Sequence, residues 1–254
     1  MNIQISGKGK TIVFLHGYCE SLDIWKAFDT TLHTEYQIVL IDLPGHGQSP
    51  LLTKDFSIDD IADQVQQELK DHGISEYFVI GHSLGGYISL ALAELYPESL
   101  LGLGLFSSST FADDEDKKKV RDKVKAYILE HGVASFMDSF ISGLFAPENR
   151  SRLSDEIEEM RISASKTPPD SVIGYAMAMK NRPDRTAVLA KSEKPVFVIA
   201  GERDMAVKLE TSQQMIDLIR RGEALVLKGA AHNGYLESKN ESISFIKSFL
   251  NQYI

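Results

Sequence analysis

The fold is decided by the stretch YFVIGHSLGG, residues 77–86. Its first four residues are apolar or aromatic, which is typical of a buried strand. A Gly-x-Ser-x-Gly pattern centred on Ser83 follows, and a segment rich in small and apolar residues then leads as a helix to Pro97. A serine between two glycines at a strand-to-helix junction is typical of a nucleophile elbow, where the glycines relieve the crowding of a strained turn. We therefore predict that Ser83 is a catalytic nucleophile; the alternative is a Gly-rich turn with an incidental serine.

Short apolar runs alternate with helical patterns along the rest of the chain. Runs typical of strands that are buried on both faces lie at residues 11–15, 37–41, 100–106, 195–200 and 224–227. Between them lie amphipathic stretches such as 57–69, which opens with a serine followed three residues later by an aspartate, a weak capping box. The alternation predicts an α/β fold with a doubly wound, mostly parallel sheet and right-handed crossovers.

One interval shows only helical patterns. Apolar stripes occur around Val120 to Ile128, Phe136 to Leu144 and Leu153 to Ala164, and a further one follows Pro168-Pro169. We predict an α/β core formed by residues 1–109 and 191–254, with a helical insertion at residues 110–190.

A serine nucleophile needs a base, and the base needs an acid that orients it. His232 and Asp204 each follow a predicted strand, at the carboxyl ends where open α/β sheets place their sites. The order Ser83, Asp204, His232 is the serine–acid–histidine order expected for such a sheet. We predict that these three residues are catalytic. The alternative acids, which also follow strands, are Asp113, Asp114 and Glu202.

The segment Leu15-His16-Gly17-Tyr18 ends the first strong strand. Since Gly17 permits a close backbone approach, we predict that the backbone N–H groups of Tyr18 and Leu84 form an oxyanion hole. The Tyr18 side chain either walls an acyl pocket or lies exposed in the turn. Aromatic and methionine side chains of the insertion suit an apolar pocket, although packing of the lid on the core explains them equally well. The candidate substrate-binding residues are Tyr18, Phe136, Met137, Phe140 and Met177.

Other polar residues near these loops have simpler interpretations. We expect His16 and His82 to hydrogen-bond loop backbone, and residues 42–49 (DLPGHGQS) to form a tight scaffold turn. Cys19 is interpreted as a bystander rather than a nucleophile. Lys180 and Arg182, near the end of the insertion, are alternative readers of a substrate carboxylate.

Five segments together resemble the α/β-hydrolase superfamily in order and spacing, over nearly the whole chain. They are FLHG (14–17), DLPGHGQS (42–49), GHSLGG (81–86), GERD (201–204) and AH (231–232). The chain looks most like small lidded carboxylesterases, enol-lactonases and pimeloyl-ester esterases. The resemblance implies the triad Ser83, Asp204 and His232, the oxyanion donors Tyr18 and Leu84, and a lid at 110–190. A serine at position 83 argues against haloalkane-dehalogenase or epoxide-hydrolase chemistry, which uses an aspartate nucleophile in this superfamily.

The predicted function is hydrolysis of a carboxylic ester, lactone or thioester of a small, apolar acyl substrate through an acyl-enzyme on Ser83. Two alternatives use the same fold. One is a carbon–carbon bond hydrolase or lyase on the same triad. The other is a receptor-like binding protein with vestigial activity.

Composition narrows the partners. The formal charge of −9, from 27 basic and 36 acidic residues without a basic stripe, argues against nucleic acid and anionic membranes. The first residues lack a signal-peptide pattern, and no apolar run approaches the roughly 18 residues that span a bilayer. A single cysteine excludes an internal disulfide and agrees with a reducing compartment.

We expect a cytoplasmic enzyme that acts on a small molecule. We expect no cofactor or metal, because metal-ligand spacings and nucleotide-binding motifs are absent from the sequence. No oligomeric state is predicted.

Overall fold

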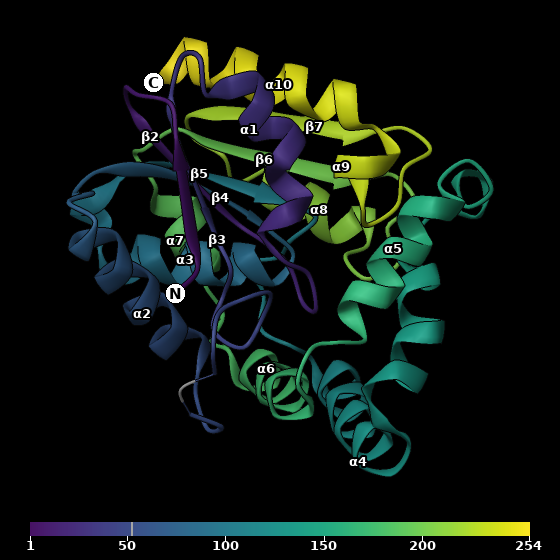
Figure 1. The fold of residues 1–254 in the computed structure, drawn as a ribbon. Helices are drawn as coiled ribbons and strands as arrows, with labels where there is room; N and C mark the ends of the chain where they lie inside the picture. Colours follow the sequence, from purple (N-terminus) through teal and green to yellow (C-terminus); the bar gives the residue numbers. More distant parts are fainter. Residues whose placement is uncertain (52) are drawn as a thin grey trace.

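The computed structural model describes residues 1–51 and 53–254. In this part of the chain, seven strands form one sheet in the order β1-β3-β2-β4-β5-β6-β7 (Figure 1). The strands are β1 (Ile3–Ser6), β2 (Thr11–Leu15), β3 (Gln37–Ile41), β4 (Tyr77–His82), β5 (Leu100–Phe106), β6 (Val196–Gly201) and β7 (Gly222–Leu227). Strand β1 runs antiparallel to β3, whereas the other neighbouring pairs are parallel. The predicted doubly wound, mostly parallel sheet is therefore confirmed, and β1 is an edge strand that the sequence pattern did not reveal.

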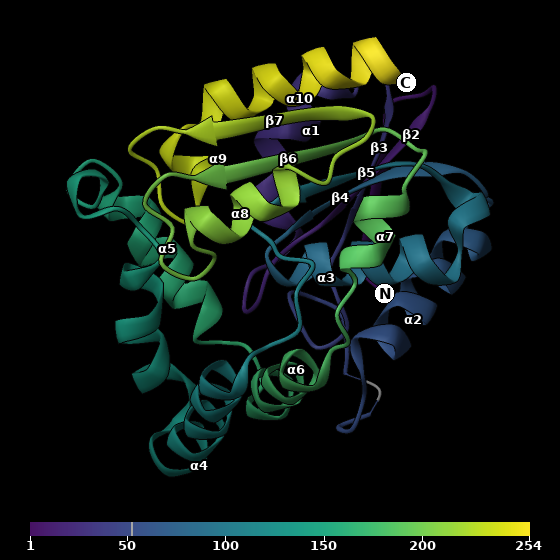
Figure 2. The same ribbon diagram turned by 180° about the vertical axis from the view of Figure 1, so that it is seen from behind.

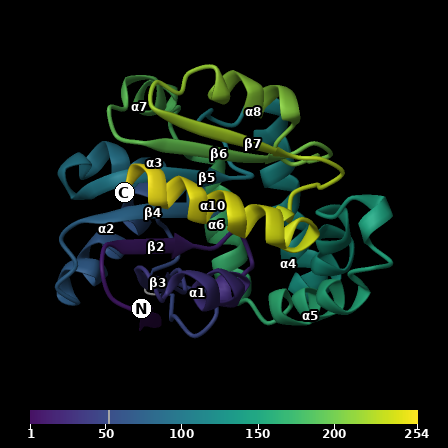
Figure 3. The same ribbon diagram turned by 90° about the horizontal axis from the view of Figure 1, so that it is seen from above.

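Helices cover both faces of the sheet. The helices α1 and α10 lie on one face, and α2, α3, α7 and α8 lie on the other (Figures 1 and 2). Their bounds are α1 (Lys26–Leu32), α2 (Ile58–Asp71), α3 (Leu84–Leu95), α7 (Thr186–Lys191), α8 (Leu209–Ile216) and α10 (Lys239–Tyr253). The short α9 (Gly234–Glu237) links β7 to α10, which crosses the same face of the sheet as α1 and contacts that helix (Figure 3).

Alternation along the strands builds two cores, one on each face. In β2, Ile12 and Phe14 pack in the core under α1 and α10, whereas Val13 and Leu15 pack in the core against α2 and α3. All four side chains are fully buried. A strand that is covered on both faces needs apolar residues at consecutive positions, which explains the continuous apolar runs of the sequence.

The chain between β5 and β6 forms helices that cluster at one end of the sheet (Figure 1). They are α4 (Glu115–Gly143), α5 (Ser154–Ala164) and α6 (Pro169–Asn181); the next helix, α7, lies on the face of the sheet and contacts α3. Helix α4 packs against both α5 and α6 and is kinked at Gly132, where φ is 79°. The stripe predicted for its first half is only partly buried. Ile128 is 3 % exposed, but Val120 is 55 % exposed, because the stripe is wider than the surface that its neighbours cover.

Candidate active site

Ser83 lies in the sharp turn between β4 and α3. Its backbone has φ 49° and ψ −112°, a left-handed conformation that costs a residue with a side chain about 1–3 kcal/mol. Two hydrogen bonds hold this turn: the Ser83 N–H donates to the Phe106 carbonyl at 2.9 Å, and the Gly86 N–H donates to the Ser83 carbonyl at 2.9 Å. These bonds fix the turn from both sides. Ser83 is the N-cap residue of α3, where backbone N–H groups favour negative charge.

The glycines on either side of Ser83 are required by close backbone contacts. A Cβ atom added at Gly81 would lie 2.2 Å from the carbonyl carbon of Gly85. A Cβ atom added at Gly85 would lie 2.3 Å from the Leu15 carbonyl oxygen. These contacts are between backbone atoms, so no side chain can rotate away to make room.

A Gly81→Ala variant is expected to lose about 3 kcal/mol of unfolding free energy, because overpacking against fixed backbone forces the strand and the helix apart. Urea denaturation followed by circular dichroism measures this loss. Gly143→Ala is the matched control, since an added Cβ there meets nothing within 4 Å and its φ is not positive. Equal unfolding midpoints for the two variants would show that the elbow tolerates a side chain.

His232 and Asp204 form a buried pair on adjacent loops. The His232 Nδ1 atom lies 2.8 Å from Asp204 Oδ2, and the two side chains are 6 % and 1 % exposed. Asp204 is oriented by its other oxygen, Oδ1, which accepts hydrogen bonds from the N–H groups of Ala206 at 2.8 Å and Val207 at 2.9 Å. Burial alone would lower the pKa of His232, but the charge and hydrogen bond of Asp204 outweigh burial and raise that pKa. The contact with Asp204 thus holds the His232 ring in one orientation.

The alternative acids are engaged elsewhere. Asp113 Oδ1 accepts a hydrogen bond from Arg182 at 2.6 Å, and Asp113 Oδ2 accepts one from Arg121 at 3.1 Å. Asp114 caps α4 by accepting from the Lys117 N–H at 2.8 Å. Glu202 accepts from the Gly229 N–H at 2.9 Å. These contacts leave Asp204 as the acid that orients His232.

The two basic residues considered as carboxylate readers are also paired. Arg182 is 6 % exposed and bonded to Asp113, and its guanidinium stacks 4.0 Å from the Tyr87 ring centroid. Lys180 donates to Asp122 at 2.6 Å. In this structure both basic side chains are therefore engaged in ion pairs between elements of the segment that joins β5 to β6.

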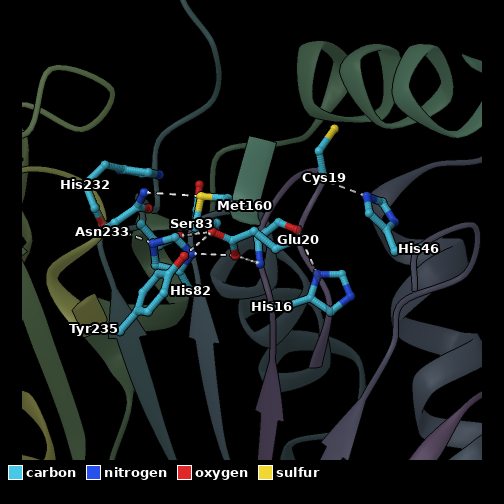
Figure 4. Close-up of polar contacts among 12 residues, drawn as sticks. His16, Cys19, Glu20, His46, His82, Ser83, Met160, His232, Asn233 and Tyr235 are labelled. Carbon is cyan, nitrogen blue, oxygen red and sulfur yellow. Dashed lines mark hydrogen bonds and ion pairs between the residues drawn. The ribbon is translucent and has the colours of Figure 1, made fainter. Parts of the chain in front are cut away.

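Ser83 and His232 lie close together where β4 and β7 end (Figure 4). The ring of His82, the residue before Ser83, lies 5.0 Å from the His232 ring, measured between centroids. The structure thus brings Ser83, His232 and Asp204 to the same edge of the sheet, although they are 28 to 149 positions apart in the sequence.

The loop after β2, which carries Tyr18, is held by two buried histidines. The His16 Nδ1–H donates to the Gly17 carbonyl at 2.8 Å, and its Nε2 accepts from the Leu43 N–H at 3.0 Å. The His46 Nε2 atom accepts from the Cys19 N–H at 3.1 Å. Burial lowers the pKa of both rings, to about 3 for His46, so both stay neutral acceptors. As predicted, His16 bonds loop backbone, and the loop that carries the Tyr18 N–H is rigidly placed.

A model of the α/β hydrolase fold matches residues 10–239 of the chain. The chain belongs to the α/β-hydrolase family.

Three relatives of this α/β hydrolase span it almost completely. The pimeloyl-[acyl-carrier protein] methyl ester esterase of Shewanella woodyi is 24 % identical over 261 residues, covering 100 % of this chain and 98 % of the relative. The solved structure of an esterase from Thermogutta terrifontis is 24 % identical, with a TM-score of 0.94 and coverage of 99 % and 93 %. That of an enol-lactonase from Burkholderia xenovorans LB400 is 18 % identical, with a TM-score of 0.91 and coverage of 98 % and 96 %. Both structures share the fold of this hydrolase.

The Tyr18 side chain of this α/β hydrolase is buried, 8 % exposed, so the alternative of an exposed turn tyrosine is wrong. Its hydroxyl donates to the Val172 carbonyl in α6 at 2.7 Å, and its ring meets Phe140 edge-on at 5.9 Å between centroids. Phe136 stacks on Phe140 at 5.0 Å. Tyr18, Phe140 and Phe136 therefore form one aromatic row from the loop after β2 into α4.

Two other candidate substrate-binding residues differ in burial. Met137 is fully buried in the core, which fits the packing role that the sequence left open. Met177, on α6, is partly buried against the same core.

Within residues 1–51 and 53–254, no helix of the hydrolase is both long and apolar enough to cross a membrane.

Sequence reasoning missed one buried acid beside the site, Glu20. Its side chain is 3 % exposed and contacts His82 Nδ1 at 2.9 Å (Figure 4). The available signal was a carboxylate two residues after Tyr18, in a loop predicted to approach the elbow. An ionisable side chain at such a place is buried only when it is paired.

Proposed function

We propose that this α/β hydrolase cleaves a carboxylic ester, lactone or thioester of a small, apolar acyl substrate through an acyl-enzyme on Ser83. One observation carries the proposal: a serine in a strained elbow stands beside a histidine whose Nδ1 is bonded to a buried carboxylate at 2.8 Å. The family membership supports hydrolysis in general. The single buried cysteine, Cys19, fits a reducing compartment, and we place the reaction in the cytoplasm, on a small molecule.

In the proposed reaction, His232 acts as general base. Since Nδ1–H is committed to Asp204, the free Nε2 atom takes the proton of the Ser83 hydroxyl as Oγ attacks the carbonyl carbon. The buried Asp204 carboxylate stabilises the imidazolium that forms. His232 then protonates the leaving alkoxide or thiolate, and water attacks the acyl-enzyme with His232 again as base.

The negative charge of the tetrahedral intermediate needs donors that are already in place. We assign these to the backbone N–H groups of Leu84, the first residue of α3, and Tyr18. Support comes from the rigid setting of both: the α3 N-terminus is fixed by the elbow, and the Tyr18 loop is held by His16 and His46. A donor of this kind typically contributes about 10²–10³ in rate.

The apolar acyl preference rests on the aromatic row. Tyr18, Phe140 and Phe136 extend from the oxyanion loop into α4, and the Tyr18 hydroxyl is occupied by Val172. The faces left to a substrate are therefore apolar. We assign α4 to α6, within residues 110–190, the role of a lid that covers the acyl group. The names of the esterase and the enol-lactonase described above are consistent with an ester or lactone as substrate.

A fluorophosphonate probe, followed by peptide mass spectrometry, tests the activated serine. We expect one phosphonyl group on the peptide that carries Ser83. Ser107→Ala is the matched control, because Ser107 also has a positive φ (47°) and is buried. We expect this variant to be labelled like the wild type and Ser83→Ala to be unlabelled.

A panel of nitrophenyl esters, lactones and thioesters of graded acyl length then tests the substrate class. We expect turnover of short and medium acyl chains. Labelling without turnover of any ester, together with cleavage of a vinylogous diketone, would replace ester hydrolysis with carbon–carbon bond hydrolysis. Absence of both label and turnover would leave a binding protein.

A further inference from the structure

A second buried acid–histidine pair, formed by Glu20 and His82, lies next to the nucleophile and has no part in the proposed reaction. Glu20 Oε2 lies 2.9 Å from His82 Nδ1, and the two side chains are 3 % and 1 % exposed. The Tyr235 hydroxyl donates to Glu20 Oε1 at 2.9 Å, and the Gly17 N–H donates to Glu20 Oε2 at 2.6 Å. Burying two ionisable groups is costly unless both are fully bonded, so a pair in this place requires an explanation.

The bonding pattern settles the protonation of this pair. Glu20 receives three donors and is the acceptor in each contact. Burial alone would raise the pKa of Glu20, but the charge and hydrogen bond of His82 outweigh burial and lower that pKa to about 2. His82 faces this carboxylate with Nδ1 and the His232 carbonyl oxygen with Nε2, at 3.1 Å. Both partners only accept, so only a ring that is protonated on both nitrogens satisfies both contacts.

The contacts of the pair join the three loops on which the proposed reaction depends. Glu20 lies in the loop that carries the Tyr18 N–H and binds that loop's own backbone at Gly17. His82 directly precedes Ser83 in the elbow. The His82 ring donates to the backbone carbonyl of His232, and the hydroxyl of Tyr235, in α9, donates to Glu20 (Figure 4).

We propose that Glu20 and His82 are positioning residues, which hold the oxyanion loop, the nucleophile elbow and the loop of the general base in one fixed mutual geometry. The proposal rests on the proposed function, because the geometry that it protects is that of Ser83, His232 and the Tyr18 N–H. Neither side chain needs to touch the substrate. A charged, fully bonded bridge resists the small shifts to which oriented reactions are sensitive, where a misplacement of about 1 Å costs about 10²-fold in rate.

The test is the steady-state kinetics of Glu20→Gln, His82→Gln and the double variant on the best ester of the panel. Each single variant removes the charge pairing between Glu20 and His82, and a glutamine at position 20 also turns an amide N–H₂ toward one of the groups that now donate to the carboxylate. We expect kcat to fall about 10²-fold in each single variant, with KM within about twofold, because the loops are misaligned while the acyl pocket is intact. Since both changes break the same link, the double variant should be no more than about threefold slower than the slower single variant.

Two further variants separate positioning from folding. Tyr235→Phe removes one donor to Glu20 and keeps the ring that packs on Trp25 and Phe106, so it should fold and lower kcat about three- to tenfold. Gln66→Met is the control, because it removes a buried hydrogen-bonding side chain of α2, bonded to Ser99 and Tyr77. It should destabilise the fold and leave kcat within twofold.

Labelling of the wild type by the fluorophosphonate is measured first, so that the two proposals fail separately. An unlabelled wild type overturns the proposed function. A labelled wild type, with kcat unchanged in Glu20→Gln and Tyr235→Phe or with multiplicative losses in the double variant, overturns the positioning role alone.

Discussion

Replacing Ser83 with alanine is expected to lower kcat on the best ester about 10⁶-fold. The hydroxyl is the group that forms the acyl-enzyme, and losses near this size accompany removal of the nucleophile in enzymes whose serine, base and acid act as a unit. The change removes one oxygen atom and leaves the β4–α3 turn with its positive φ and its backbone hydrogen bonds. Initial rates from purified protein, with active sites counted by the fluorophosphonate in the wild type, measure the loss.

The residual rate of the Ser83→Ala protein is informative as well. Oxyanion donors and binding alone sustain about 10³–10⁴-fold over the reaction in water, so the variant should stay above the uncatalysed rate. Trace wild-type protein is excluded by showing that the residual activity resists the probe. A loss of less than tenfold would mean that another group attacks the substrate.

Asp204→Asn is expected to lower kcat about 10⁴-fold. The asparagine side chain is nearly isosteric, and its oxygen still accepts from the Ala206 and Val207 N–H groups. With its oxygen so placed, the amide N–H₂ faces His232 Nδ1, which must then accept a hydrogen bond. The proton of the neutral ring moves to Nε2, the atom that has to receive the Ser83 proton, and the base is lost.

The pH dependence of kcat/KM is a second measurement that tests the role of Asp204. His232 works as a neutral base, so kcat/KM of the wild type should fall as pH drops through the raised pKa of His232, above 6.5. Removing the Asp204 charge removes a principal cause of that rise, so the midpoint of the residual activity should move to lower pH. Glu202→Gln is the control, with activity near that of the wild type. Normal activity in Asp204→Asn, together with a large loss in Glu202→Gln, would transfer the role of the orienting acid.

Local signals predicted the parts of the fold that depend on neighbouring residues. Ser57 and Asp60 form the expected capping box at the start of α2, with the Asp60 N–H donating to Ser57 Oγ at 3.1 Å and Ser57 N–H donating to Asp60 Oδ2 at 2.8 Å. The turn at 42–49 is closed by Asp42, whose Oδ2 accepts from the Gln48 N–H at 2.9 Å. Periodicity placed the buried strands to within a few residues, because burial on both faces dictates their composition.

Long-range pairing was beyond those signals. Strand β1 has half-exposed residues and exists because it pairs with β3, from Ile3 with Ile41 to Ser6 with Ile38. The pairing of Glu20 with His82 joins positions 62 apart, and the sequence around either residue gives no indication of the other. A pattern read along the chain records what a residue prefers. Which partner it meets depends on how β2 and β4 lie side by side in the sheet.

The hydrogen bond from the Tyr18 hydroxyl to the Val172 carbonyl links the position of the Tyr18 loop to the position of helix α6. Val172 belongs to α6, among the helices that we expect to shape the substrate, whereas the Tyr18 backbone is assigned to the oxyanion hole. Mutations that remodel α6 for a new acyl group therefore also displace the donor. Variants of this hydrolase that accept new acyl groups through changes in α6 are therefore expected to have a lower kcat, unless the Tyr18 hydroxyl gains another hydrogen-bond acceptor.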